Sequence, residues 1–156
     1  MVFPTLVGGT NWQSPSYDAS SGRLFVVYAD GAQRYIREKS TYEPGKAYWG
    51  GRSVPSGELP KVGIKSIDTR TGDVKWDYQI SQGFLAAGVL ATSTGLLFSA
   101  TAEGNLIALE SLTGKPLWRM QTGASTAASP ISYSVNGKQY IAVASGMVLY
   151  SLALPD

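Results

Sequence analysis

Two stretches of this chain repeat each other at a fixed distance. Residues 63–76 read GIKSIDTRTGDVKW, and residues 105–118 read NLIALESLTGKPLW. Both carry a Thr-Gly pair with a tryptophan four residues after the glycine, and these tryptophans, Trp76 and Trp118, lie 42 residues apart. A period of roughly 40–50 residues is typical of β-propellers, whose blades are four-stranded antiparallel sheets. The repeat therefore predicts an all-β chain built from propeller blades.

The first half of each unit repeats as well. Three segments share one plan, in which a strand is followed by a small polar turn, a glycine and an apolar strand. The glycine lies at the predicted hairpin corner, where a positive φ is often needed and glycine alone adopts it freely. The three corner glycines are Gly22, Gly95 and Gly137.

We therefore expect a single domain over 1–156, a partial β-propeller of about three four-stranded antiparallel blades. The blades are expected at about 10–80, 88–122 and 128–154. The strands of the second blade are expected at 88–92, 96–100, 106–110 and 117–121. The third blade has only three strand candidates. Because three blades cannot close a conventional ring and open faces expose apolar surface, the chain is expected to belong to a larger propeller or to pair with another molecule.

The segment 33–60 interrupts the first blade and is rich in Tyr, Gly and Pro without clear periodicity. We expect a long ordered loop here. It is either a surface excursion that covers the outer strand of the blade, or a lid or partner contact built on Tyr42, Tyr48 and Trp49.

The composition excludes several kinds of site. The chain has no histidine and no cysteine, so zinc sites of the usual kind, thiol nucleophiles and His-based triads are excluded. Its 13 basic and 11 acidic side chains are scattered, which indicates no nucleic-acid partner. No segment is long and apolar enough to predict a membrane span, and the N-terminus does not read as a signal peptide.

The stretch GGTNW, residues 8–12, is typical of the floor of a binding site. Its two glycines allow a ligand to approach the backbone closely. Asn11 offers amide donors and Trp12 an aromatic face. The alternative is structural: Asn11 caps a turn and Trp12 fills the core near the propeller axis.

The TGxxxW repeats resemble the tryptophan-docking motifs of the pyrroloquinoline-quinone (PQQ) dehydrogenases, eight-bladed propellers that oxidise alcohols or aldoses in the bacterial periplasm. Residues 8–26, GGTNWQSPSYDASSGRLFV, resemble the segment of the alcohol-dehydrogenase branch in which an Asn-Trp pair reaches the cofactor. Residues 88–123 and 127–146 resemble late blades of that branch in the same order. The resemblance covers nearly the whole chain and maps it to the C-terminal third of the enzyme domain.

This resemblance implies that Asn11 and Trp12 bind PQQ, with Asn11 bonded to a carboxylate or quinone oxygen and Trp12 bordering the ring. In the family, calcium bridges PQQ to a Glu and an Asn, and an Asp is the catalytic base. Those residues belong to earlier blades, so we assign no catalytic residue and no metal ligand here, and we expect the chain alone to be inactive. A further family tryptophan is replaced by Ala86 or Ala87, with Phe84 the nearest aromatic.

The acidic residues are expected to bind turn amides, because none has the spacing of a calcium loop. They are Asp18, Asp30, Asp68, Asp73, Asp77, Glu103 and Glu110.

Two other hypotheses stay open. The chain could be a non-enzymatic propeller module for protein–protein contacts, which needs the docking tryptophan but not Asn-Trp at the axis. It could also self-associate, with copies burying each other's open blade faces.

Overall fold

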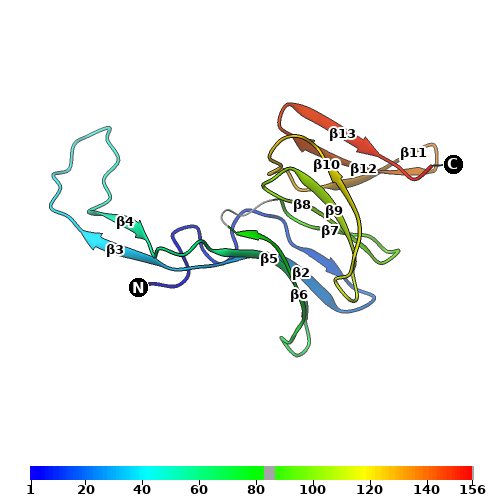
Figure 1. The fold of residues 1–156 in the computed structure, drawn as a ribbon, viewed down its shortest axis with the longest axis horizontal. Helices are drawn as coiled ribbons and strands as arrows, with labels where there is room; N and C mark the ends of the chain where they lie inside the picture. Colours follow the sequence, from blue (N-terminus) through cyan, green and yellow to red (C-terminus); the bar gives the residue numbers. More distant parts are fainter. Residues whose placement is uncertain (83–86, 156) are drawn as a thin grey trace.

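The computed structural model describes residues 1–82 and 87–155 and shows an all-β chain (Figure 1). Its strands in the described residues are β1 (Ser16–Asp18), β2 (Arg23–Asp30), β3 (Gln33–Arg37), β4 (Gly51–Pro55), β5 (Lys61–Asp68), β6 (Val74–Gln82), β7 (Leu90–Ala91), β8 (Leu96–Ala100), β9 (Asn105–Glu110), β10 (Pro116–Gln121), β11 (Ile131–Val135), β12 (Lys138–Ser145) and β13 (Val148–Leu152).

Three sheets follow one another along the chain. The first sheet has the order β1-β2-β5-β6, the second sheet β7-β8-β9-β10, and the third sheet β11-β12-β13. Every pairing within them is antiparallel. This arrangement is that of a partial β-propeller, and the predicted fold class is confirmed.

The strands expected in the second sheet are confirmed to within two residues at each end. Strand β8 has the predicted bounds, and β9 and β10 each begin one residue early. Strand β7 is shorter than predicted and covers only Leu90–Ala91. The turns are the reason for this agreement, because Gly95 and Gly114 both have positive φ and fix where the flanking strands end.

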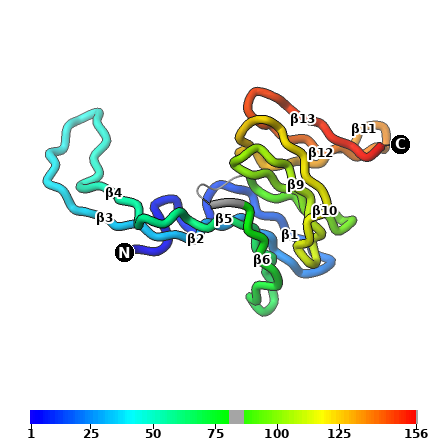
Figure 2. Tube along the Cα trace, in the orientation of Figure 1, coloured from blue at the N-terminus to red at the C-terminus, as the bar shows by residue number. Residues whose placement is uncertain are grey.

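The segment 33–60 differs from the expected loop. Strands β3 and β4 form an antiparallel hairpin, with Gln33 opposite Pro55 and Arg37 opposite Gly51. The hairpin projects away from the three sheets (Figure 1), and Figure 2 shows the N-terminal segment running along its base, where Val2 bridges to Gln33. Its strands are short, polar and mostly exposed, so they lack the alternation that marks a half-buried strand.

Large apolar side chains join the first sheet to the second. Strand β2 turns one face inward, and all residues of β9 except the last are buried, because neighbouring sheets cover both of its faces. The buried residues of this cluster are Phe25, Val27, Ile64, Val89, Leu97, Ile107 and Leu109.

Trp76 on β6 completes the same interface. Its indole Nε1 donates a hydrogen bond of 2.9 Å to the carbonyl oxygen of Ser111 in the β9–β10 turn. Its ring lies against Gly114, where an added Cβ would come within 2.8 Å of the indole. The ring centroids of Trp76 and Phe25 are 5.8 Å apart. Trp76 of the first sheet is therefore packed against, and hydrogen-bonded to, the β9–β10 turn of the second sheet.

Smaller side chains join the second sheet to the third. The buried residues here are Ala87, Ala100, Leu106 and Val143, with Met120, Tyr150 and Leu152 packed against them. Within the described residues, no helix is long and apolar enough to cross a membrane.

Candidate functional site

The GGTNW segment forms a loop tied to the first sheet. Gly8 has a φ of +80°, a conformation that favours glycine, and its amide donates to the Thr5 carbonyl at 2.9 Å. The Gly9 carbonyl accepts the amide of Ala29 on β2 at 2.8 Å. The two glycines therefore set the course of the loop and anchor it.

Asn11 and Trp12 lie on the exposed side of this loop. Asn11 Nδ2 donates to the Val7 carbonyl at 2.8 Å, which holds its carboxamide in place. Among the described residues, no hydrogen bond to Asn11 Oδ1 is found. The Trp12 side chain is 61% exposed. The loop thus presents an amide and an aromatic face to solvent.

Gln13 follows this pair and was not singled out from the sequence. It is only 4% exposed, and its Oε1 has no hydrogen-bond partner within the described residues. A buried amide oxygen without a partner is costly, so it marks a place where a polar ligand would be stabilised. The only sequence signal was its position directly after the Asn-Trp pair.

The segments that come directly before the first strand of each sheet meet next to Gln13. The Val89 amide donates to the Ser14 carbonyl at 2.9 Å, and the Gly88 amide donates to Ser129 Oγ at 3.2 Å. A Cβ on Gly88 would meet the Ser14 backbone within 2.6 Å. Gly88 therefore permits the close approach that brings these innermost segments together.

The replaced family tryptophan falls partly outside the described residues. Phe84 and Ala86 lie outside them. Ala87 is fully buried, and its amide donates to the Ala100 carbonyl at 3.3 Å.

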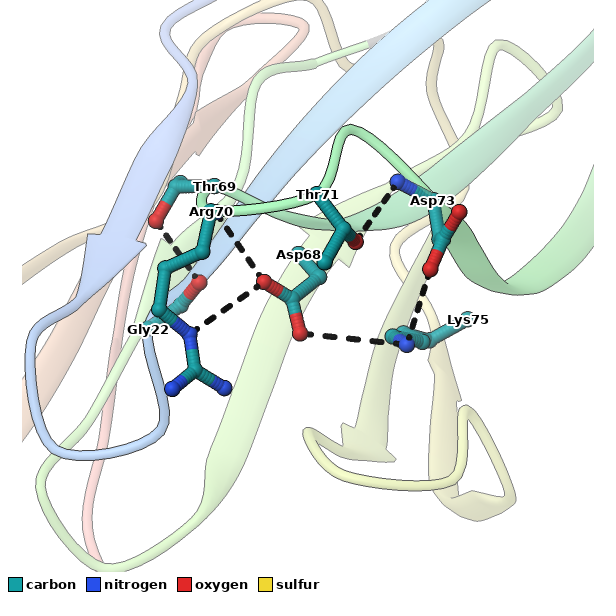
Figure 3. Close-up of polar contacts among 7 residues, drawn as sticks. All are labelled: Gly22, Asp68, Thr69, Arg70, Thr71, Asp73 and Lys75. Atoms are coloured by element: carbon teal, nitrogen blue, oxygen red, sulfur yellow. Dashed lines mark hydrogen bonds and ion pairs between the residues drawn. The ribbon is translucent and has the colours of Figure 1, made fainter.

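Carboxylates at the turns of the first sheet bind amides, as predicted for Asp18 and Asp68. Asp18 Oδ1 accepts the Ser20 amide at 2.9 Å, and the Ser20 and Ser21 hydroxyl groups bond the same carboxylate. Asp68 Oδ1 accepts the Arg70 amide at 3.0 Å, as Figure 3 shows. These bonds stabilise the charged forms and lower the pKa of both carboxyl groups from 3.8, chiefly through the Ser21 hydroxyl for Asp18 and the Arg70 amide for Asp68.

Other carboxylates bind side chains instead. The pKa of Asp73 is lowered, first by its hydrogen bond with Thr71 and then by Lys75. The Tyr28 hydroxyl donates to Asp77 Oδ1 at 2.8 Å, and burial, together with this carboxylate, raises the pKa of Tyr28 to about 12. Thr113 Oγ1 donates to Glu110 Oε2 in the β9–β10 turn.

No group of three or more His, Cys, Asp or Glu side chains that could hold a metal ion occurs in the described part of the chain. Two hollows lie between sheets. One of about 210 Å³ is lined by residues of the first and second sheets, and one of about 1020 Å³ by the second and third. Neither is lined by Asn11 or Trp12.

Several known proteins that this chain resembles are quinoproteins. A family model for the β-propeller domain of PQQ glucose, ethanol and alcohol dehydrogenases matches residues 81–141. A quinoprotein ethanol dehydrogenase of Pseudomonas putida is 35% identical over 156 residues, which are 99% of this chain and 24% of that protein. Over nearly its whole length the chain is thus similar to part of a quinoprotein alcohol dehydrogenase.

Two further relatives are similar to this chain. A 1-butanol dehydrogenase (quinone) of Thauera butanivorans is 34% identical over 99% of the chain and 24% of its own length. A europium-containing methanol dehydrogenase has a solved structure that matches with a TM-score of 0.84 and 25% identity, over 93% of this chain and 26% of that one. The chain thus spans about a quarter of the length of the relatives that it matches.

Proposed function

We propose that this chain is part of the propeller of a PQQ- and calcium-dependent dehydrogenase that oxidises alcohols or sugars in the periplasm. The observation that carries the proposal is the GGTNW loop, which presents Asn11 and Trp12 to solvent in a chain that is similar to part of a quinoprotein alcohol dehydrogenase. A propeller module without a cofactor has no need of an amide and an indole placed in this way.

The residues of the loop fit the chemistry of PQQ. The cofactor is flat and carries carboxylates, so it binds best to amide donors and aromatic faces. Asn11 would donate its second Nδ2 hydrogen to a carboxylate or quinone oxygen, since Val7 takes only the first. Trp12 would border the ring. The buried Gln13 Oε1, which has no partner among the described residues, is an acceptor, so it would bind a donor group rather than a carboxylate or quinone oxygen of the cofactor.

PQQ, when bound, would accept the two electrons that the alcohol loses. The part played by this chain is to bind and orient the cofactor. We assign it no catalytic base and no metal ligand, and we propose that the isolated chain does not turn over substrate. The calcium ion and the base would be held by other blades of the whole protein.

The test uses the whole protein that contains this chain. PQQ is titrated into the metal-loaded apoprotein, and binding is followed by quenching of tryptophan fluorescence. We expect Trp12→Ala and Asn11→Ala each to weaken PQQ binding by about tenfold or more, which corresponds to the loss of one good contact. Trp49→Ala, at an 80% exposed tryptophan of the β3–β4 hairpin, is the matched control and should leave affinity unchanged.

Two results would contradict the proposal. If the whole protein binds no PQQ, the chain is a non-enzymatic propeller module. If PQQ binds but neither variant weakens it, Asn11 and Trp12 are not the residues that hold it.

A further inference from the structure

The first residue of the β3–β4 hairpin, Gln33, is hydrogen-bonded to the N-terminal segment through both its backbone and its side chain. The Val2 amide donates to the Gln33 carbonyl at 2.8 Å, and the Gln33 amide donates to the Val2 carbonyl at 3.0 Å. Both backbone groups of Gln33 therefore point away from Pro55, its partner in the hairpin, which has no amide to donate. The Leu6 amide donates to Gln33 Oε1 at 2.6 Å. The base of the hairpin thus fixes the course of residues 2–6.

A tight turn lies between this segment and the GGTNW loop. The Gly8 amide donates to the Thr5 carbonyl at 2.9 Å, which is the hydrogen bond of a β-turn over residues 5–8. Leu6 and Val7 are the two central residues of the turn. Since the amide of Leu6 and the carbonyl of Val7 take no part in the turn's own bond, each can bond a side chain.

Two side chains bond these two backbone groups. Gln33 Oε1 accepts the Leu6 amide, and Asn11 Nδ2 donates to the Val7 carbonyl at 2.8 Å. Because the turn lies between the two side chains, a rotation of the turn that breaks the bond at Leu6 also moves the acceptor of Asn11. The orientation of the Asn11 carboxamide is thereby linked to Gln33.

The loop has a second anchor on β2, but that anchor does not depend on a side chain. The Gly9 carbonyl accepts the Ala29 amide at 2.8 Å, so both partners belong to the backbone. The anchor at Leu6 uses the half-buried side chain of Gln33 and can be removed by substitution. The contribution of Gln33 can therefore be measured while the loop stays attached to β2.

We propose that Gln33 is a positioning residue for the cofactor contact of Asn11. Gln33 Oε1 holds the turn at residues 5–8, and the turn holds the Asn11 carboxamide, so that its second Nδ2 hydrogen has a fixed direction. A donor that is oriented before its ligand arrives loses less entropy on binding than a freely rotating one. The inference rests on the proposed function, because PQQ is the ligand that Asn11 would bind. It adds that the β3–β4 hairpin takes part in the site through its first residue.

The experiment uses the whole protein that contains this chain, loaded with its metal ion. Gln33→Met removes the acceptor and keeps the length of the side chain, whereas Gln33→Glu keeps an acceptor oxygen. Gln139→Met is the matched control, because it removes another glutamine hydrogen bond, of 2.7 Å to Ser132 Oγ, in the third sheet. Each change is made alone and in the Asn11→Ala background.

Hydrogen exchange measures the bond at Leu6, and PQQ titration measures its effect on the cofactor. We expect Gln33→Met to speed exchange of the Leu6 amide by about tenfold. It should weaken PQQ binding by about three- to fivefold, because the orientation of Asn11 is lost while its donor remains. In the Asn11→Ala background Gln33→Met should change PQQ affinity by less than about twofold, since the two residues act as a unit. Gln139→Met should change neither quantity.

The conservative variant distinguishes the lost acceptor from other effects of the substitution. Gln33→Glu should restore slow exchange at Leu6 and most of the PQQ affinity. Its added charge repels an anionic cofactor, and comparing the Glu and Met variants in the Asn11→Ala background measures that repulsion separately. A purely structural role for Gln33 would not produce a loss of affinity that disappears together with Asn11.

The inference is overturned if Gln33→Met leaves exchange at Leu6 or PQQ affinity unchanged, or if it weakens PQQ binding equally in both backgrounds. Exchange in β9, measured alongside, should be unchanged and shows that the sheets are formed in each variant. A loss of affinity in Asn11→Ala but not in Gln33→Met refutes this inference alone. If the wild-type protein binds no PQQ, or if Asn11→Ala binds it as tightly as the wild type, the proposed function fails and this inference fails with it.

Discussion

The interface between the first and second sheets and that between the second and third are built from the same repeat, but they differ in how the tryptophan is placed. Trp76 is hydrogen-bonded to Ser111 and packed on Gly114, whereas Trp118 is 43% exposed and lines the hollow of about 1020 Å³ between the second and third sheets. Trp76 is held by the outer turn of the second sheet, whereas no hydrogen bond to the Trp118 indole is found among the described residues. The same type of side chain should thus contribute more to stability in the first interface than in the second.

The largest effect should come from removing each tryptophan in turn. We expect Trp76→Ala to lower the free energy of unfolding by about 3–5 kcal/mol, since a packed aromatic is replaced by a cavity. Trp118→Ala, at an exposed position, should cost about 1 kcal/mol or less. Urea denaturation followed by far-UV circular dichroism measures both. Equal losses would show that the two indoles have equivalent settings and would remove the contrast.

A second pair of variants tests the β9–β10 turn that contacts Trp76 rather than the tryptophan itself. Gly114→Ala should cost roughly 1–2 kcal/mol for its left-handed backbone and a further 1–3 kcal/mol for the overlap with Trp76. Gly72→Ala, at the equivalent turn of the first sheet, is the control. Gly72 has a φ of +78° and nothing within 4 Å of an added Cβ, so only the backbone cost remains.

The two glycine variants should therefore differ in their midpoints of urea denaturation, with Gly114→Ala the less stable. In the Trp76→Ala background the difference should disappear, because the overlapping ring is gone. A difference that persists there would place its cause outside the indole contact.

Much of the fold could be predicted because the repeat carries its own turn chemistry. Thr-Gly pairs and corner glycines mark the strand ends of the second sheet, and these were placed to within two residues. The β3–β4 hairpin was missed because its five-residue strands are polar and exposed, so no periodicity distinguishes them from a loop.

The candidate site was harder to predict than the fold. Asn11 and Trp12 stand out as residue types, but their exposure depends on how the loop is tied to Ala29 and Thr5. Gln13 is notable only because its side chain is buried with an unpartnered oxygen, which no local pattern shows. The hydrogen bond that holds Trp76 likewise joins residues 35 positions apart, Trp76 and Ser111.

A third prediction compares the first and second sheets at alkaline pH. In the first sheet Tyr28 donates to Asp77, and in the second the position of Asp77 is taken by Arg119, which donates to Asn105 Oδ1 at 2.8 Å. The pKa of Tyr28 is raised from 10.0 to about 12, so the folded state favours the neutral hydroxyl. Its contribution to stability is complete below pH 10 and is lost as the pH rises through about 12.

The unfolding free energy of the chain should accordingly fall between pH 10 and 12, and Tyr28→Phe should remove part of that slope. Hydrogen exchange resolved by residue should show the loss first in β5 and β6. An equal loss in β9 and β10 would argue against Tyr28 as the source.

The smallest effect is expected at acid pH and concerns the turn of the first sheet shown in Figure 3. The Arg70 amide, and then the charges of Arg70 and Lys75, lower the pKa of Asp68 from 3.8. A depressed pKa contributes stability above pH 3.8, and that contribution is lost as the pH falls through the folded-state value. Asp68→Asn should therefore flatten the fall in stability on the acid side, and adding Asp18→Asn should flatten it further, because the pKa of Asp18 is also lowered. Urea midpoints measured from pH 5 to pH 2.5 test this, and a variant curve parallel to that of the wild type would show that these turn carboxylates do not set the acid limit.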